Sequence, residues 1–233
     1  VGERIDEGPW LRELDDVIVG NGVSLLPWNS GGVEHPHDTP PYPFMPSPTS
    51  ALRCRKAPLR DYCVGLMASP GRKSVEPMAA VTAPERTAAQ HQSLLHFVGS
   101  GGWSDEKVLG KVRKMVLPAI ERQAPIEAWI IDDTGFPKQG RHSVGVARQY
   151  CGQLGKQDSC QVAVSLSLAN RHASLPVAYR LYLPKEWADD DERRRKVGVP
   201  PEVGFQTKPE IALEQLKWAC AAGLPPGVVL MDA

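Results

Sequence analysis

The sequence predicts an α/β fold in its C-terminal half, made of three strands, a helix and a further strand, with a helical region before it. Two observations carry this prediction. Past Gln123 the spacing of apolar residues changes from a helical period to a period of two. A helix with its own start and stop signals then separates the third strand from the fourth. We therefore predict three parts: residues 1–50, a helical region over 51–123, and an α/β domain over 124–233.

Composition and charge exclude several classes of protein. The chain of 233 residues is 42% hydrophobic and has a formal net charge of zero, as expected of a globular protein. It contains no run near the roughly 18–20 apolar residues of a membrane span and no secretion signal. Its five cysteines follow no paired pattern, which favours reduced thiols in a cytoplasm. No glycine-rich phosphate loop is present, so use of ATP or NAD has no support.

The first fifty residues differ from the rest of the chain. They hold two basic and eight acidic side chains and 8 of the 22 prolines, five of these within Thr39–Pro48. Proline removes a backbone donor and restricts its neighbour, so we expect a disordered linker or a segment foreign to the rest. Apolar residues around Asn21-Gly22 could form a strand with a turn. His35 and His37 lack further ligands nearby, which favours a solvated loop over a metal site.

Two helices are predicted in the middle region. The first covers Glu85–Val98 and places one set of residues on one face: Ala88, His91, Leu95 and Val98. The second begins after Ser104, a good N-cap, and has its own apolar face: Val108, Val112, Met115 and Val116. This region is rich in Lys and Arg and could dock on phosphates, although such a charge run is usually a solvated helix face.

The α/β domain begins with a short apolar strand that ends at acidic residues. The predicted strands are 128–131, 162–168, 175–183 and 228–231, with a Gly- and Lys-rich loop between the first two. A charged insertion at 189–196 precedes the helix. Thr207 and Glu210 have the spacing of a capping box that opens this helix. Its predicted inward residues are Ala212, Leu213, Leu216, Ala219 and Cys220.

Asp132 and Asp232 each follow an apolar strand. A strand–helix–strand connection lets the last strand pair in parallel with an earlier one through a right-handed crossover. If the partner is the first strand, the two acids lie on neighbouring strands about 5 Å apart. Two such carboxylates are what a two-metal site needs. This is the arrangement of the RNase H fold, and we predict an incomplete mixed sheet of that kind, in the order βββαβ.

Two other interpretations of the acids stay open. An aspartate at the end of a strand often caps a turn, and Asp133-Thr134-Gly135 has that character. The same three residues match the Asp-Thr-Gly of aspartic proteases, in which two carboxylates activate water without metal. However, Asp132 precedes the motif, Phe136 follows it, and no second copy exists. The helix-rich topology also does not suit an all-β protease.

Longer stretches of this sequence closely resemble the DDE-superfamily transposases of bacterial insertion sequences. The central match is WIIDDTGFPKQG from Trp129 and SVGVARQYCGQLGK from Ser143. Upstream, RKSVEPMA from Arg72 and QHQSLLHFV from Gln90 look like the helical region of that family. Downstream, LPKEW from Leu183 and FQTKP from Phe205 also fit. The resemblance runs from about Pro58 to Ala233.

The resemblance implies a metal-dependent nuclease and strand transferase. Asp132 matches the family's first catalytic acid and Asp232 its second, and together they would bind Mg²⁺ or Mn²⁺ at a two-metal site. The third acid, a Glu on a later helix, is expected beyond residue 233, so we expect a truncated catalytic domain. Basic residues near the first acid would suit phosphates: Lys138, Arg141, Arg148 and Lys156. Tyr150 could stack on an unpaired base, and the alternative for all five is a solvated loop.

We therefore predict a cytoplasmic fragment of an insertion-sequence transposase whose helical region binds DNA. Its partners are transposon ends and target DNA, a homo-oligomer is compatible, and neither a membrane nor a nucleotide cofactor is involved. The alternative is a catalytically inactive DNA-binding remnant. Metal-dependent nicking of DNA separates the two, because the remnant binds without cleaving.

Overall fold

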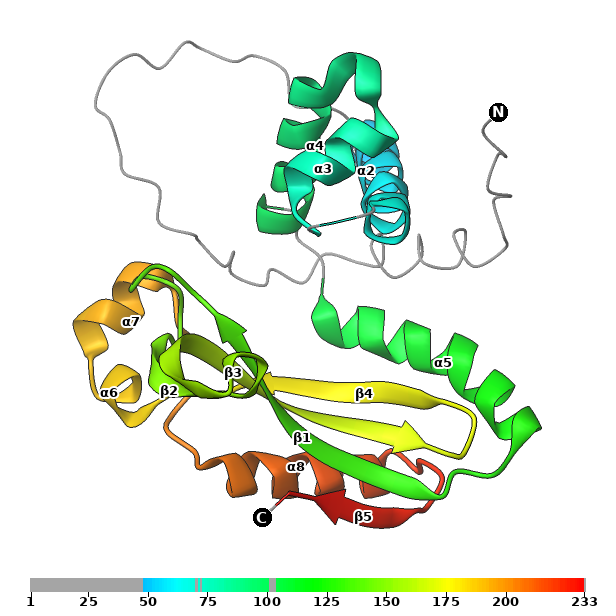
Figure 1. Ribbon diagram of the computed structural model, residues 1–233, viewed down its shortest axis with the longest axis vertical. Helices are drawn as coiled ribbons and strands as arrows, with labels where there is room; N and C mark the ends of the chain where they lie inside the picture. Colours follow the sequence, from blue (N-terminus) through cyan, green and yellow to red (C-terminus); the bar gives the residue numbers. More distant parts are fainter. Residues whose placement is uncertain (1–47, 70, 72, 101–103, 233) are drawn as a thin grey trace. The chain divides into compact units, whose positions relative to one another are not determined.

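The computed structural model describes residues 48–69, 71, 73–100 and 104–232 (Figure 1). Three features of the first fifty residues lie outside the described residues: the turn predicted around Asn21-Gly22, the histidines His35 and His37, and most of the Pro-rich segment. The chain divides into two compact units between Val108 and Leu109. No helix in the described part of the chain has the length and apolar character needed to cross a membrane.

Among its described residues, the first unit has three helices and a short 3₁₀ turn before α5 (Asp105–Gln123). Its elements are α2 (Pro48–Ala68), α3 (Val75–Thr82), η1 (Pro84–Arg86) and α4 (Thr87–Ser100). Met78, Ala79 and Leu94 form its buried core. The predicted helix in this region is confirmed.

The predicted face of α4 is wrong, however. Gln90, Leu94 and Phe97 are buried, whereas Leu95 and Val98 are 42% and 40% exposed. Gln90 takes an interior position because its amide donates to Asp61 Oδ2 at 2.6 Å. A polar residue with a partner in the interior shifts the buried stripe away from the one that apolar residues alone indicate.

Helix α5 (Asp105–Gln123) begins where the sequence predicts it. The backbone N–H of Lys107 donates to Ser104 Oγ at 3.3 Å, which is the expected N-cap bond. Its buried residues are Leu117 and Ile120, while Val116 is 37% exposed. From Leu109 onward the chain belongs to the second unit.

The second unit contains a five-stranded mixed sheet. Its strands are β1 (Ala128–Pro137), β2 (Ala147–Cys151), β3 (Lys156–Ala169), β4 (Ser174–Leu181) and β5 (Val228–Met231). The order is β2-β3-β1-β5, and β4 pairs with β3. Strands β1 and β5 are parallel and every other pair is antiparallel. The predicted mixed α/β architecture is confirmed, and the earlier strand with which the last strand pairs in parallel is the first.

Two strand predictions are wrong. Strand β1 does not end at Ile131 but continues through the acidic residues to Pro137. It can continue because β3 pairs with it over this whole length and takes up the backbone hydrogen bonds of the polar segment. Strand β2 lies in the stretch predicted as a loop, and the turn between β2 and β3 contains η2 (Gly152–Leu154).

The charged insertion is helical and has its own small core. It forms α6 (Lys185–Ala188) and α7 (Asp191–Val197). Trp187 is fully buried against Val144 and Leu183, and its indole N–H donates to Val146 O at 2.8 Å. The insertion is therefore fixed to the segment that precedes β2.

Helix α8 (Lys208–Ala221) has the predicted capping box between Thr207 and Glu210. Its predicted inward face is wrong in two positions, since Leu213 is 51% exposed and Cys220 is exposed. Gln215 is buried instead, and its amide donates to Val164 O at 3.0 Å. A buried hydrogen bond to the sheet thus sets which side of α8 faces inward.

Helices α5 and α8 pack on the same side of the sheet. Alternate residues of β1 and β3 share one core cluster with both helices, and the shared members are Trp129, Ile131, Val164, Leu166, Leu168, Leu117, Ile120, Ile211, Ala212 and Ala219. The guanidinium of Arg113 on α5 also lies 5.2 Å from the ring of Trp218 on α8. We call this side of the sheet the helix side. The opposite side, to which Asp132 of β1 belongs, we call the acid side.

Candidate active site

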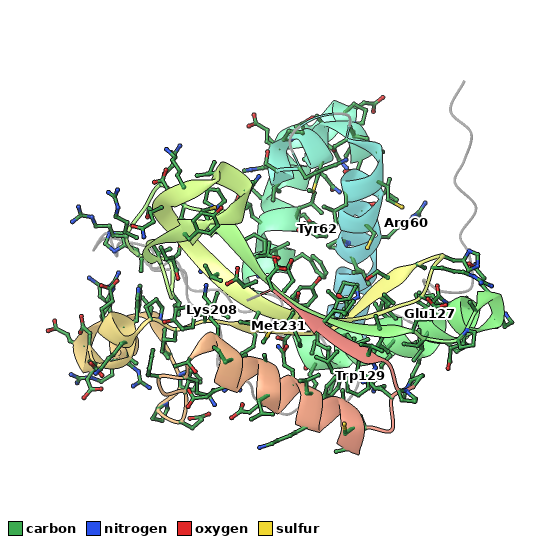
Figure 2. All side chains as sticks on the ribbon, turned by 60° about the horizontal axis from the view of Figure 1, so that its bottom comes forward. Arg60, Tyr62, Glu127, Trp129, Lys208 and Met231 are labelled. Atoms are coloured by element: carbon green, nitrogen blue, oxygen red, sulfur yellow. The ribbon has the colours of Figure 1, made fainter. Side chains whose placement is uncertain are left out.

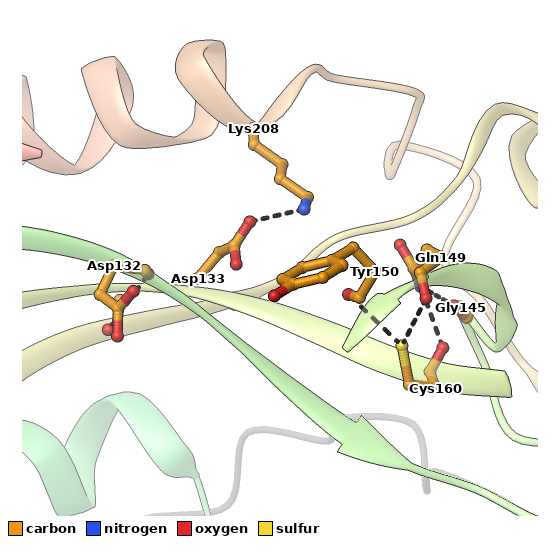
Figure 3. A network of polar contacts seen from close by, with 8 residues as sticks. Asp132, Asp133, Gly145, Gln149, Tyr150, Cys160 and Lys208 are labelled. Carbon is orange, nitrogen blue, oxygen red and sulfur yellow. Dashed lines mark hydrogen bonds and ion pairs between the residues drawn. The ribbon is translucent and has the colours of Figure 1, made fainter. Parts of the chain in front are cut away.

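The adjacent acids of β1 point to opposite sides of the sheet (Figure 3). Successive side chains alternate along a strand, so Asp133 shares the helix side with the buried Ile131. Asp132 lies on the acid side, opposite Ser165 of β3, whose hydroxyl donates to the Asp132 carbonyl oxygen at 3.4 Å. Both carboxylates are exposed. Although the two acids are neighbours in sequence, they belong to two different surfaces.

Asp133 is paired with a lysine. Lys208 Nζ lies 2.5 Å from Asp133 Oδ2, and the two side chains are 34% and 44% exposed. Lys208 is the first residue of α8, and its ammonium lies 5.7 Å from the centre of the Tyr182 ring. In the described part of the chain, the Asp132 carboxylate has no comparable partner, either by hydrogen bond or by ion pair.

The second predicted acid follows the parallel strand. The register of β1 with β5 runs from Ala128↔Val228 to Ile131↔Met231, so Asp132 and Asp232 are the next residues of the two strands. Side chains at the same level of parallel neighbours point to the same side. If the register continued by one residue, Asp232 would lie on the acid side, beside Asp132.

Contacts at the beginning of β5 fix this register, and Figure 2 labels Glu127 and Trp129, which make two of them. The indole N–H of Trp129 donates to Pro225 O at 2.7 Å, and the N–H of Val228 donates to Glu127 O at 2.9 Å. Gly227 lies so close to β1 that a Cβ there would be 2.9 Å from backbone atoms of Ala128. These contacts fix the register of β5 with β1, and hence the point at which Asp232 follows β5.

The donor chemistry suits a hard divalent cation, but the set is small. Carboxylate oxygens are preferred ligands of Mg²⁺ and Mn²⁺. Within the described residues, no group of three or more His, Cys, Asp or Glu side chains lies close enough together to hold a metal ion. Asp132 and Asp232 would supply two carboxylates at most, and the Asp133 carboxylate pairs with Lys208.

The predicted DNA-contacting residues lie along the β2–β3 hairpin and the loop before it. Lys138 follows β1, and its N–H donates to Ser159 O at 2.9 Å. Arg148 and Tyr150 are two residues apart on β2 and so lie on the same face of that strand. Both are exposed, and the exposed fraction of Tyr150 is 58%. All of these residues lie beyond the point on β1 where the acids stand, toward its C-terminal end.

Arg141 and Lys156 have contacts that limit their freedom. The Arg141 carbonyl accepts a hydrogen bond from Arg193 Nη2 at 2.6 Å, while Arg141 itself is exposed. The ammonium of Lys156 lies 3.0 Å from Asp158 Oδ2. The pKa of Asp158 is lowered, first by the hydrogen bond from the Ser159 N–H and then by Lys156.

Two cysteines under the hairpin have structural roles. Cys151 and Cys160 are fully buried beside Val162. Burial raises the pKa of Cys160, so its thiol stays protonated at neutral pH.

Sequence reasoning missed Lys208 as a member of the site region. Its position at the start of a capped helix was recognisable, but its partner Asp133 lies 75 residues away. The available signal was the strand–helix–strand order, because the helix of such a unit begins near the end of the strand before it.

The structure is that of an α/β protein with a parallel pair of strands, β1 and β5, each followed or continued by an aspartate. The family model described as DDE superfamily endonuclease matches residues 44–233, so the chain belongs to this family. Endonucleases of this superfamily generally use divalent metal ions.

A curated relative carries a more specific description. The chain is 28% identical over 170 residues to the probable transposase for insertion sequence element IS701 of Microchaete diplosiphon. The aligned part is 73% of this chain and 40% of the relative, so the chain corresponds to less than half of that protein. No solved structure matches the chain.

Proposed function

We propose that this chain is part of an insertion-sequence transposase that cuts DNA phosphodiester bonds and transfers strands, with an RNase H-like catalytic sheet. The observation that supports the proposal is the β1–β5 register, Ala128↔Val228 to Ile131↔Met231, which if continued by one residue would set Asp132 and Asp232 side by side on two parallel strands. Membership of the DDE endonuclease family supports the same chemistry.

In this proposal Asp132 and Asp232 hold divalent cations, Mg²⁺ or Mn²⁺. Bound cations of this kind activate an attacking hydroxyl and stabilise the leaving oxygen of a phosphodiester. Asp132 suits this role because its carboxylate is exposed and unpaired among the described residues, whereas the Asp133 carboxylate is neutralised by Lys208.

The basic hairpin would hold the DNA backbone. Lys138, Arg141, Arg148 and Lys156 offer charge to phosphates, and Tyr150 offers an exposed ring for stacking on a base. The helical region within 51–123 would add sequence-independent contacts with the same DNA. Because the residues follow the acids along the hairpin, a bound strand would run from the acids toward β2.

Metal binding is the first test. Manganese affinity is measured by calorimetry and electron paramagnetic resonance on the full chain, on Asp132→Ala and on Asp232→Ala. We expect each substitution to weaken binding at least about tenfold, since loss of outer-sphere partners alone costs that much in known sites. Asp158→Asn is the control, a half-buried strand aspartate on the hairpin that pairs with Lys156, and should bind as the unchanged chain does. Binding that survives both alanine substitutions contradicts the proposal.

A second candidate is a DNA-binding protein without nuclease activity. It is favoured by the absence of a third acidic ligand near the two aspartates in the described residues. Incubation with supercoiled plasmid and Mn²⁺ distinguishes the candidates. Nicking that disappears in Asp132→Ala supports the nuclease, and salt-sensitive DNA binding without nicking supports the second candidate.

A further inference from the structure

Lys208 distinguishes two carboxylates that are otherwise alike. Asp132 and Asp133 are adjacent, exposed and on the same strand, yet among the described residues a cation of the protein lies beside Asp133 alone, at 2.5 Å. Alternation along β1 sends them to opposite sides, and α8 supplies the lysine on the helix side alone. The pair Asp-Asp in the sequence is therefore not a pair of equivalent ligands.

The position of Lys208 is itself fixed by its surroundings. It is the first residue of α8, directly after the N-cap Thr207, whose hydroxyl accepts from the Glu210 N–H. The ring of Tyr182 lies 5.7 Å from its ammonium, and an aromatic face attracts a cation. Tyr182 is in turn in edge contact with Phe205. These contacts hold the ammonium near Asp133.

The charge of Asp133 matters for any cation held by its neighbour. An unpaired carboxylate next to Asp132 would add a negative charge well within the screening length of about 8–10 Å. It would attract divalent cations to the helix side of the strand, away from Asp232. Lys208 neutralises this charge, so the net attraction is left on the acid side.

We infer that Lys208 is the specificity-determining counter-ion of this site: it occupies Asp133 and leaves Asp132, together with Asp232, to bind the divalent cation. The inference rests on the proposed function. Lys208 acts through Asp133 and is a positioning residue rather than a catalytic one.

The test uses substitutions that separate charge from shape. In Lys208→Met, Asp133 becomes an uncompensated negative charge, so Mn²⁺ should bind about three- to tenfold more tightly. In Asp133→Asn, Lys208 becomes an uncompensated positive charge, and Mn²⁺ should bind more weakly by a similar factor. The double variant, with both substitutions, restores neutrality and should return to within about twofold of the unchanged chain. Lys208→Arg keeps the charge and should behave as the unchanged chain.

A second ion pair between α8 and the sheet provides the matched control. Arg180 on β4 pairs with Glu214 on α8, and their side chains are 42% and 49% exposed. Glu214→Gln should leave Mn²⁺ affinity unchanged. Urea midpoints should stay close to one another in all these variants, because exposed ion pairs add little to stability.

The following outcomes overturn the inference. If Lys208→Met and Asp133→Asn leave affinity unchanged, the pair has no influence on the metal. If both single variants and the double variant lose affinity, the pair holds the shape of the site rather than its charge. If Mn²⁺ binding in the unchanged chain does not depend on Asp132, the proposed function is wrong and the inference falls with it. Dependence on Asp132 without any effect of Lys208 overturns the inference alone.

Discussion

Strand β1 is held by its two neighbours to very different degrees. On one edge, β3 pairs with it along all ten residues, and the β3 side chains Val162, Val164, Leu166 and Leu168 are almost completely buried. On the other edge, β5 pairs over four residues, each between 49% and 67% exposed. The first proposed ligand, Asp132, therefore lies on a strand with strong support, while the second, Asp232, follows a strand with weak support.

This difference indicates which part of the proposed site is most easily disrupted by substitution. Burial of apolar area contributes most of the stability of such a unit, and β5 contributes little of it. Its position relies on backbone pairing with β1 and on a few contacts at its start. We expect damage to β3 to unfold the whole unit, and damage near β5 to release Asp232 alone.

Leu166→Ala should have the largest effect. Leu166 is fully buried in the cluster that joins the sheet to α5 and α8. Removing such a side chain costs about 2–5 kcal/mol, in part through the cavity that remains. Urea denaturation followed by circular dichroism should show this loss across the second unit. Leu213→Ala is the control, since Leu213 is 51% exposed, and its free energy of unfolding should change by less than about 0.5 kcal/mol. Equal losses in the two variants would mean that Leu166 does not lie in the core.

Gly227→Ala should act on β5 specifically. The added Cβ would lie 2.9 Å from backbone atoms of Ala128, and backbone cannot move aside as a side chain tip can. Such overpacking costs about 1–3 kcal/mol. Hydrogen exchange should show lost protection at Val228–Met231 and retained protection over 162–168, together with weaker Mn²⁺ binding.

Gly204→Ala is the control for this substitution. Gly204 has nothing within 4 Å of an added Cβ and no left-handed backbone conformation. Its variant should exchange as the unchanged chain does. Loss of protection in β3 as well as in β5 after Gly227→Ala would show that the two strands unfold together. That result would contradict the proposal that β5 is held more weakly than β3.

The same contrast explains what could be predicted from sequence. Strands with a strong apolar pattern were recognisable, including β5, because its four residues are all apolar even though they are exposed. The capping box of α8 was also recognisable, since it depends on residues three apart. Local patterns indicated these elements without any knowledge of their partners.

Features that depend on distant partners were missed. The polar half of β1 is a strand only because β3 pairs with it, and β2 is a strand for the same reason. The inward faces of α4 and α8 depend on Gln90 and Gln215, whose hydrogen bonds cannot be read from apolar spacing. The alternation that separates Asp132 from Asp133 was implicit in the sequence, but the role of Lys208 required the three-dimensional arrangement.

Trp129→Phe should have the smallest effect on stability of the three variants. It tests most directly what holds β5 against β1. Phenylalanine keeps most of the buried ring but cannot donate to Pro225 O, the hydrogen bond that connects β1 to the turn before β5. A hydrogen bond of this kind contributes about 0.5–1.5 kcal/mol. We expect a loss in that range, with faster hydrogen exchange confined to residues 225–231.

Trp218→Phe is the matched control, because Trp218 is 38% exposed on α8 and contacts Arg113 rather than β5. It should leave exchange in β5 unchanged. If Trp129→Phe also leaves hydrogen exchange in β5 unchanged, then the indole hydrogen bond does not determine the register of β5 with β1. Asp232 would in that case be held by backbone hydrogen bonds and by the fit of Gly227, and the indole would contribute only its share of the core.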